Sequence, residues 1–224
     1  MKVVAISCIH NDVESLVNFS EKLESLKFDV VVCPGDFLDS PIKKFSNLEL
    51  GKLIVAGLKA FGKPVLVVPG AWDRDLIGYF EEEKISIHGK GVIIGEVGFY
   101  GFGGAKTPFS LPYEPKEEEI EKGLEKGYGE IKEARIKFQV THAPPANTRL
   151  DVIPSGAHVG SEAVRKFIEE KQPHVAVCSH IHESRGIDVI GKTKIINTGR
   201  FPEGYCGLIT ILDEKVEVEL INLT

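Results

Sequence analysis

Residues 2–10 read Lys2-Val3-Val4-Ala5-Ile6-Ser7-Cys8-Ile9-His10, an apolar run that leads directly into polar side chains. The same arrangement recurs four times along the chain. The apolar runs 30–33, 65–68, 138–140 and 175–178 lead into Pro-Gly-Asp-Phe-Leu-Asp (34–39), Pro-Gly-Ala-Trp-Asp (69–73), Thr-His (141–142) and Ser-His-Ile-His (179–182). In open α/β sheets, ligands bind in the crevice at the carboxyl ends of the strands. The pattern therefore predicts an α/β fold in which five distant segments converge.

Helical stretches separate the first of these runs. Residues 12–27 carry apolar side chains at approximately helical spacing, and Asp12 is a natural N-cap. We expect strands at 2–6, 29–33 and 64–68, with helices at 12–27 and 45–61. Because a helix joins each strand to the next, the three strands should be parallel.

The pattern changes in the second half of the chain. Glycines at positions 89, 91, 95 and 98 break residues 85–102 into short β segments and indicate hairpins. Residues 115–134 are rich in Glu and Lys, which predicts a solvated surface helix interrupted near Gly127 and Gly129. Further strands are expected at 136–140, 174–178, 186–190, 194–196, 208–212 and 216–221, and a further helix at 161–171.

The composition is that of an ordinary globular protein, and we expect a single domain over residues 1–224. The net charge of −6 argues against a protein that holds extended nucleic acid, because that mode needs a basic face. No apolar run approaches the roughly 18 to 20 residues of a membrane-spanning helix, and no secretion signal is visible.

The cysteines Cys8, Cys33, Cys178 and Cys206 are widely spaced and form no C-x-x-C pair. Reduced thiols in a cytoplasmic protein are the plain interpretation, and disulfides are the less favoured one. Abundant Lys and Glu, with Gln only at positions 139 and 172, hint at a thermophilic source. The oligomeric state is left open, with a homo-oligomer as one alternative.

Convergence of the five segments would gather His10, Asp36, His142, His180 and His182. Four imidazoles and a carboxylate suit a divalent transition metal better than Ca²⁺ or Mg²⁺, which prefer oxygen ligands. A carboxylate can bridge two cations, and His180 and His182 project to the same side if their segment is extended. Taken singly, a histidine after a strand is usually a hydrogen-bonded turn residue, but the recurrence of the pattern favours a metal site.

In order and spacing these segments resemble the motifs of the calcineurin-like metallophosphoesterase family, which are D-x-H, G-D-x-x-D, G-N-x-D/E, a lone His after a strand, and G-H-x-H. The resemblance covers almost the whole chain. It implies a four-layer αββα sandwich of two mixed β-sheets flanked by helices. It also implies that His10 and His182 hold one metal ion, that His142 and His180 hold a second, and that Asp36 bridges the two.

The resemblance extends to residues beside the implied ligands. Asp39 and Asp73 match acidic motif positions, where they would orient the ligands. Residues 197–200, Asn-Thr-Gly-Arg, look like the Asn-Pro-Gly turn of the family, with Thr198 in place of Pro.

Three positions depart from the family pattern. Cys8 stands where the first motif has Asp, and as a thiolate ligand it would favour a softer ion such as Zn²⁺ or Fe²⁺ over Mn²⁺. Ala71 stands where the family has the Asn that contacts the second metal and phosphate, and its methyl group cannot bind either. Trp72 stands where many relatives carry a His that protonates the leaving group. The resident metal, one or two ions of Zn, Fe, Mn or Ni, is left open.

The leading hypothesis is hydrolysis of a small phosphomonoester or phosphodiester through a metal-activated hydroxide, since two ions about 3.5 to 4 Å apart lower the pKa of a bridging water toward about 7. Asp36, His142 and Asp73 are the candidate catalytic residues. The alternative is a weakly active or inactive module of the same fold that binds a metal, phosphate or nucleotide. A nuclease is a third option, disfavoured by the acidic charge.

Four polar residues outside the motifs receive structural interpretations. His88, His158 and His174 are expected at the surface. Arg149 and His158 follow the lone-His motif and could reach a phosphate, but a solvated loop is the favoured interpretation.

Overall fold

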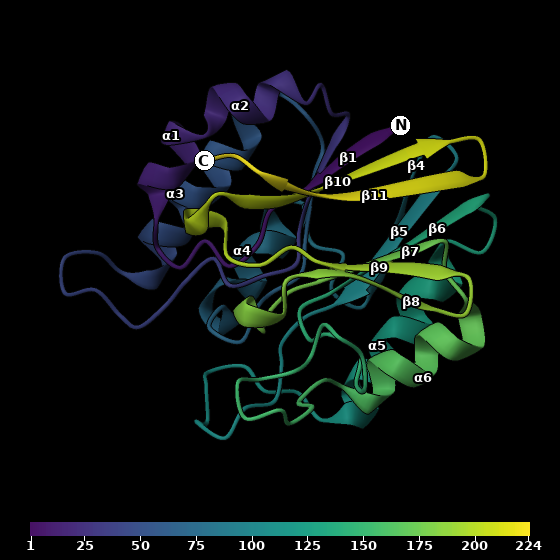
Figure 1. Ribbon diagram of the computed structural model, residues 1–224. Helices are drawn as coiled ribbons and strands as arrows, with labels where there is room; N and C mark the ends of the chain where they lie inside the picture. The colour runs from purple at the N-terminus through teal and green to yellow at the C-terminus, as the bar shows by residue number, and fades with distance from the viewer.

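A computed structural model describes residues 1–224. Two β-sheets lie face to face, and helices cover the outer side of each (Figure 1). The predicted four-layer αββα sandwich is therefore confirmed.

The first sheet has the strand order β11–β10–β1–β2–β3. Strands β1, β2 and β3 are parallel, as the alternation of strands and helices predicts, and β10 and β11 join β1 in antiparallel fashion. The bounds are β1 Lys2–Ala5, β2 Val30–Cys33, β3 Val65–Val67, β10 Tyr205–Leu212 and β11 Lys215–Asn222.

The second sheet has the strand order β4–β5–β6–β7–β9–β8. Its four inner strands are parallel, and the hairpins β4–β5 and β8–β9 supply the two antiparallel edges. The hairpins confirm the interpretation of the glycine-rich stretch. The bounds are β4 Lys90–Ile94, β5 Val97–Phe102, β6 Ile136–Thr141, β7 Val175–Cys178, β8 Gly186–Ile190 and β9 Thr193–Asn197.

Three apolar clusters hold the four layers together. Along the first strand run, Val3 and Ala5 face the second sheet, whereas Val4 and Ile6 face the helices, because successive side chains of a strand point to opposite faces. Strands β2, β3 and β7 are buried on both faces, which is why their sequences are continuously apolar rather than alternating. This packing fixes the strand ends from which the polar loops depart.

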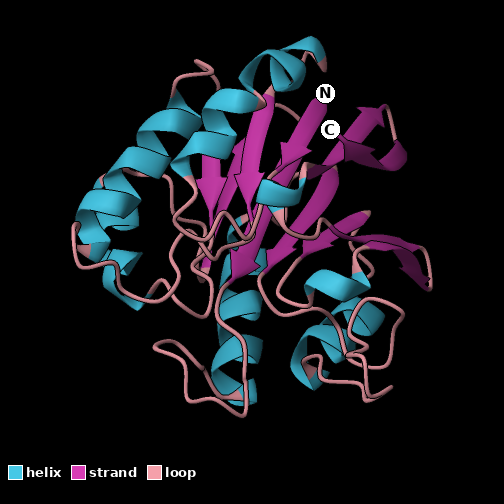
Figure 2. Cartoon of the chain, turned by 60° about the vertical axis from the view of Figure 1, so that its left-hand side comes forward, coloured by secondary structure: helices cyan, strands magenta, loops and turns pink.

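Helices α1 to α4 cover the first sheet, and α5 and α6 cover the second (Figure 2). No helix is long and apolar enough to cross a membrane. The bounds are α1 Val13–Asn18, α2 Ser20–Ser25, α3 Asn47–Lys59, α4 Ile77–Glu82, α5 Glu117–Glu130 and α6 Glu162–Lys171, with single 3₁₀ turns at Arg74–Leu76, His182–Ser184 and Phe201–Glu203.

Two helix predictions are wrong in detail. The single helix expected at 12–27 is broken at Phe19, where the Ser20 hydroxyl donates to the Val17 carbonyl and competes with the helical bonds. The interruption expected near Gly127 and Gly129 is absent, because α5 runs on to Glu130. Gly127 instead allows close packing, since a Cβ there would lie 2.6 Å from the Lys90 carbonyl oxygen of β4.

Candidate metal centre

The five predicted segments meet at the carboxyl ends of the strands, where backbone hydrogen bonds join them. The amide of Cys8 donates to the carbonyl of Gly35 over 2.9 Å, and the amide of His10 donates to the carbonyl of Asp36 over 3.1 Å. The amide of Ser179 donates to the carbonyl of His142 over 3.1 Å. The loops after β1 and β2, and those after β6 and β7, are thus tied in pairs, which sets the positions of their side chains.

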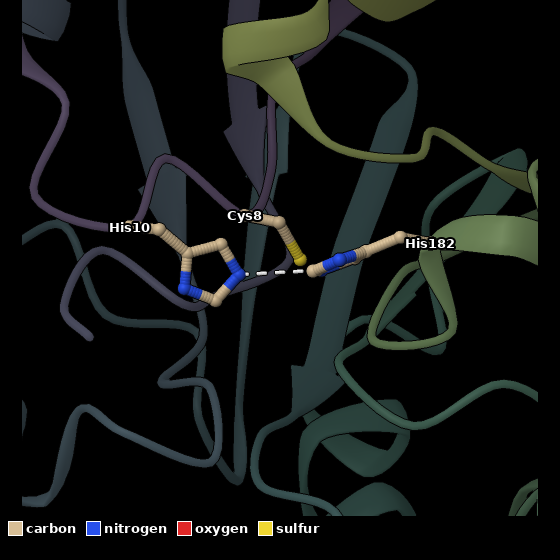
Figure 3. A group of neighbouring side chains, drawn as sticks. All are labelled: Cys8, His10 and His182. Carbon is tan, nitrogen blue, oxygen red and sulfur yellow. Dashed lines mark hydrogen bonds between the residues drawn. The ribbon is translucent and has the colours of Figure 1, made fainter. Parts of the chain in front are cut away.

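The first group of potential ligands contains Cys8, His10 and His182, whose donor atoms lie within 4.8 Å of one another. Figure 3 shows the sulfur and the two imidazoles pointing toward a common space from two distant segments of the chain. The two Nε2 atoms of His10 and His182 are 3.2 Å apart. Both imidazoles are partly accessible, whereas the thiol is buried.

The second group contains Asp36, His142 and His180, whose donor atoms also lie within 4.8 Å of one another. Oδ2 of Asp36 is 3.2 Å from Nε2 of His142, and that nitrogen is 3.1 Å from Nδ1 of His180. The same carboxylate oxygen is 3.9 Å from Nε2 of His10 in the first group. Asp36 therefore stands between the two groups, the position that the resemblance implies for a bridging carboxylate.

Strained backbone conformations aim several of these side chains. Cys8, His10, Asp36 and His180 have φ values of 50°, 52°, 55° and 72°, in the left-handed region. Each such residue costs on the order of 1–3 kcal/mol and persists only where its surroundings enforce it. The segment 180–182 is not extended, because His180 is left-handed and His182 begins a 3₁₀ turn, so the condition under which the two histidines would project to the same side is not met. The two histidines consequently serve different groups.

Backbone carbonyls determine which nitrogen of two imidazoles faces inward. Nδ1 of His142 donates to the carbonyl of Pro34 over 2.7 Å, and Nδ1 of His10 donates to the carbonyl of Leu38 over 3.2 Å, because a carbonyl oxygen can only accept. In the neutral rings each Nε2 therefore carries a lone pair. The lone pair of a neutral His142 would face the Asp36 carboxylate, so either a proton on Nε2 or a metal ion must lie between the two acceptors. The donor set thus fits a metal ion.

The electrostatics of the site favour the protonation states that bind metals. Burial lowers the pKa of His182 to about 4, and burial followed by the charge of His142 lowers the pKa of His180 to about 3. Burial opposes ionisation of Asp36, but His142 and His10 hold the pKa of its carboxyl well below the usual range. At neutral pH His180 and His182 are therefore neutral imidazoles and Asp36 is a carboxylate, the forms that coordinate divalent ions. Burial opposes protonation of His142, but the adjacent Asp36 carboxylate raises its pKa.

A chain of buried hydroxyls lies behind Cys8. The Ser179 hydroxyl donates to Oγ of Ser7 over 2.7 Å, and the Ser7 hydroxyl donates to the carbonyl of Gly199 over 2.9 Å. The thiol of Cys8 can then donate to Oγ of Ser179, 2.8 Å away. Burial, followed by the charge of Asp36, raises the pKa of the Cys8 thiol. The thiolate form would therefore need a cation beside it to be stable. In that form the sulfur could accept a hydrogen bond from the Ser179 hydroxyl.

Asp73, a predicted catalytic residue, is fully buried behind Asp36. Its carboxylate accepts hydrogen bonds from the amides of Phe37, Leu38 and Gly70 over 3.2, 3.0 and 2.7 Å. Burial, and then repulsion from Asp36, raises the pKa of Asp73 to about 7. With its oxygens directed at backbone amides, Asp73 positions the loop that carries Asp36.

The two departures in the third motif, Ala71 and Trp72, lie in the same loop. The backbone amide of Trp72 donates to Oδ1 of Asp36 over 3.1 Å, which leaves Oδ2 for the histidines. Ala71 is buried, and its carbonyl accepts from the amide of Tyr113 over 2.9 Å. Both positions therefore contribute backbone groups to the site. The acidic motif residue Asp39 is partly exposed, with Oδ2 3.7 Å from Nδ1 of His10.

Most residues outside the motifs have structural roles. Arg149 is largely exposed and lies 3.5 Å from the Asp188 carboxylate, and His158 is exposed and bonded to Asp151. The surface position expected for His88 is wrong, because His88 is largely enclosed. Its Nδ1 accepts from the amide of Gly103 over 3.0 Å, and its Nε2 donates to the Tyr113 hydroxyl over 3.0 Å.

The sequence reasoning missed the hydroxyls of Ser7, Ser179 and Thr198 that surround the thiol. Each had a sequence signal, because Ser7 and Ser179 are adjacent to motif residues and Thr198 lies in the Asn-Thr-Gly-Arg turn. All four cysteines are buried and unpaired.

Comparison with known proteins identifies the family. The model of the calcineurin-like phosphoesterases matches residues 1–184 of this chain. The chain belongs to this family. An uncharacterized protein of Methanocaldococcus jannaschii is 34% identical over 213 residues, which cover 92% of this chain and 90% of the relative.

Solved structures share the calcineurin-like phosphoesterase fold with this chain at low sequence identity. A protein of Thermus thermophilus is 18% identical with a TM-score of 0.72, and the match covers 100% of this chain and 99% of that one. A dimetal phosphatase from Danio rerio is 10% identical with a TM-score of 0.68, covering 100% and 96%. A structure described as a novel archaeal phosphodiesterase is 12% identical with a TM-score of 0.57, covering 99% and 100%.

Proposed function

We propose that this protein is a metal-dependent phosphoesterase that hydrolyses a small phosphomonoester or phosphodiester. The observation that carries the proposal is the gathering of six donor side chains in two groups, with Oδ2 of Asp36 3.2 Å from Nε2 of His142 in one group and 3.9 Å from Nε2 of His10 in the other. The family to which the chain belongs and its fold neighbours, a phosphatase and a phosphodiesterase among them, support the reaction class.

Six side chains would hold the metal. Cys8, His10 and His182 form one donor group, Asp36, His142 and His180 form the other, and Asp36 is shared. A divalent ion bound there supplies Lewis acidity that activates water and neutralises charge on the phosphoryl group.

The remaining roles belong to groups of this chain. The carbonyls of Pro34 and Leu38 hold two imidazoles in the metal-binding tautomer. Asp73 holds the Asp36 loop, and the Trp72 amide orients the Asp36 carboxylate. With Trp72 in place of a histidine acid, the site suits substrates whose leaving group departs without protonation.

A second candidate function is a metal- or phosphate-binding module with little turnover. The buried methyl group of Ala71 favours it, because no amide oxygen is offered at that position. Losing a partner that supports a metal ligand typically costs about 10- to 100-fold in affinity or activity, and loss of a ligand should cost at least as much.

The deciding experiment measures hydrolysis and metal content together. Wild type and Asp36→Asn are assayed on p-nitrophenyl phosphate and bis-p-nitrophenyl phosphate with Mn²⁺, Zn²⁺, Fe²⁺ or Ni²⁺ added. We expect Asp36→Asn to reduce hydrolysis at least about 100-fold. Asp213→Asn, at an exposed carboxylate in the β10–β11 turn, is the matched control and should stay within a few-fold of wild type. Stoichiometric metal without turnover in wild type would favour the binding module.

A further inference from the structure

Arg200 lies in the turn that follows β9, and this turn is clamped against both sides of the first ligand group. The amide of Phe201 donates to the carbonyl of Ser7 over 3.1 Å, directly before Cys8. On the other side, Nδ2 of Asn197 donates to the carbonyl of Ile181 over 2.8 Å, directly before His182. The position of Arg200 is therefore set by the same loops that carry the ligands.

The charge of Arg200 is not neutralised within the chain. No carboxylate lies within 4.0 Å of its guanidinium, and its side chain makes no hydrogen bond to the protein. Its neighbour Arg185 differs in both respects, since it lies 3.9 Å from the Glu203 carboxylate and stacks 4.2 Å from the ring centre of Tyr205. Of these two arginines, only Arg200, which is partly buried, remains available for an anion.

The turn places the positive charge of Arg200 next to the loops that carry Cys8 and His182. An unpaired cation beside a metal-type donor set opposes the binding of a metal. An anionic ligand bound at the same place offsets that repulsion, so the arrangement favours joint occupancy by a cation and an anion.

We infer that Arg200, held by its turn beside Cys8 and His182, binds the terminal phosphate of a phosphomonoester substrate. This inference rests on the function proposed above and narrows its substrate class. A guanidinium can meet two phosphate oxygens at once. A phosphomonoester has three terminal oxygens and a charge near −2, so it still directs an oxygen at the ligand groups, whereas a diester has only two such oxygens and one charge.

The test uses the full-length, metal-loaded protein and inorganic phosphate as the probe. Isothermal titration calorimetry gives the phosphate Kd of wild type, Arg200→Ala and Arg200→Lys. We expect Arg200→Ala to raise the Kd about 10- to 100-fold, and Arg200→Lys to lie between, because it keeps the charge and loses the planar fork. The metal content of Arg200→Ala should be at least that of wild type, because the substitution removes a positive charge and no ligand atom. Arg149→Ala is the matched control, since it removes an equal charge from an exposed, ion-paired site, and its Kd should match wild type.

Kinetics provide the second readout. Arg200→Ala should raise KM for p-nitrophenyl phosphate by a similar factor and change KM for bis-p-nitrophenyl phosphate much less. An unchanged phosphate Kd in Arg200→Ala, or a wild type that binds no phosphate, overturns the inference. Arg200-dependent phosphate binding without hydrolysis by wild type supports it while refuting the proposed reaction. Metal-dependent hydrolysis by wild type, together with a phosphate Kd that is the same in Arg200→Ala, supports the proposed reaction and refutes the role of Arg200.

Discussion

The two ligand groups share a design of one acidic or thiol side chain with two imidazoles, but their surroundings differ. In the first group, His10 and His182 are partly accessible and Cys8 is held by a chain of hydroxyls. In the second, His142 has no exposed surface and Asp36 has almost none. His180 of the second group is partly accessible like His10 and His182, so the difference is that the second group has two buried members, Asp36 and His142, and the first has one, Cys8.

The residues that hold the ligands in place also differ between the two groups. Asp73 fixes the Asp36 loop through three backbone amides, and the segment 103–116 lies beside the second group, where Tyr113 is bonded to Ala71. Hydroxyls beside the first group can instead reverse their hydrogen bonds when the thiol changes its charge. From this comparison we expect the second group to act as an anchor, and we expect the first, which contains the thiol and lies beside Arg200, to affect metal preference and anion binding.

The largest expected effect concerns the rigid anchor. Asp73→Ala leaves three buried amides without an acceptor, and should lower the free energy of unfolding by about 3–5 kcal/mol. Urea unfolding of the metal-free protein measures it. Asp39→Ala removes the other acidic motif residue, whose side chain is 42% exposed, and should change stability by less than about 0.5 kcal/mol. Equal effects of the two substitutions would refute the idea of an anchor.

The free energy of unfolding should depend on pH through His88, which is bonded to Gly103 and Tyr113 of the segment 103–116. Burial lowers the pKa of His88 to about 4, below its ordinary value of 6.5, so the unfolded chain binds the proton more tightly. The stability due to neutral His88 is fully present above pH 6.5 and is lost as pH falls toward 4, by up to about 3 kcal/mol.

Chemical denaturation of wild type and His88→Asn at several pH values isolates this contribution. The variant should show a flatter dependence between pH 6.5 and pH 4. Parallel curves for the two proteins would mean that His88 is not buried in its neutral form.

A smaller effect is expected from restoring the family residues at the first group and its neighbour. Cys8→Asp combined with Ala71→Asn should raise Mn²⁺-supported hydrolysis about 10- to 100-fold, because oxygen ligands replace a sulfur and a methyl group. The single variants serve as controls, and metal content is measured in each. A folded, metal-loaded double variant without a gain would count against the ligand assignment.

Much of the fold could be predicted from sequence because burial leaves a local pattern. The apolar strand runs, the helical spacing and the glycine-marked hairpins each reflect whether a residue faces the core. The prediction failed where a single contact overrode the pattern. Gly127 resembles a helix breaker in sequence, yet in the structure it makes room for the backbone of β4.

The α/β alternation and the convergence of polar residues at the strand ends could be derived from the sequence, because order and spacing along the chain record them. The four-layer αββα arrangement and the candidacy of Cys8 followed from the resemblance to the family. How those residues are presented depends on tertiary contacts. The tautomer of His142 depends on the carbonyl of Pro34, and the hydrogen bonding of the Cys8 thiol depends on Ser179. Arg200 has no ion-pair partner, because the nearby Glu203 carboxylate is paired with Arg185. Pro34 is distant in sequence from His142, Ser179 from Cys8, and Arg185 from Glu203, so no local pattern records these contacts.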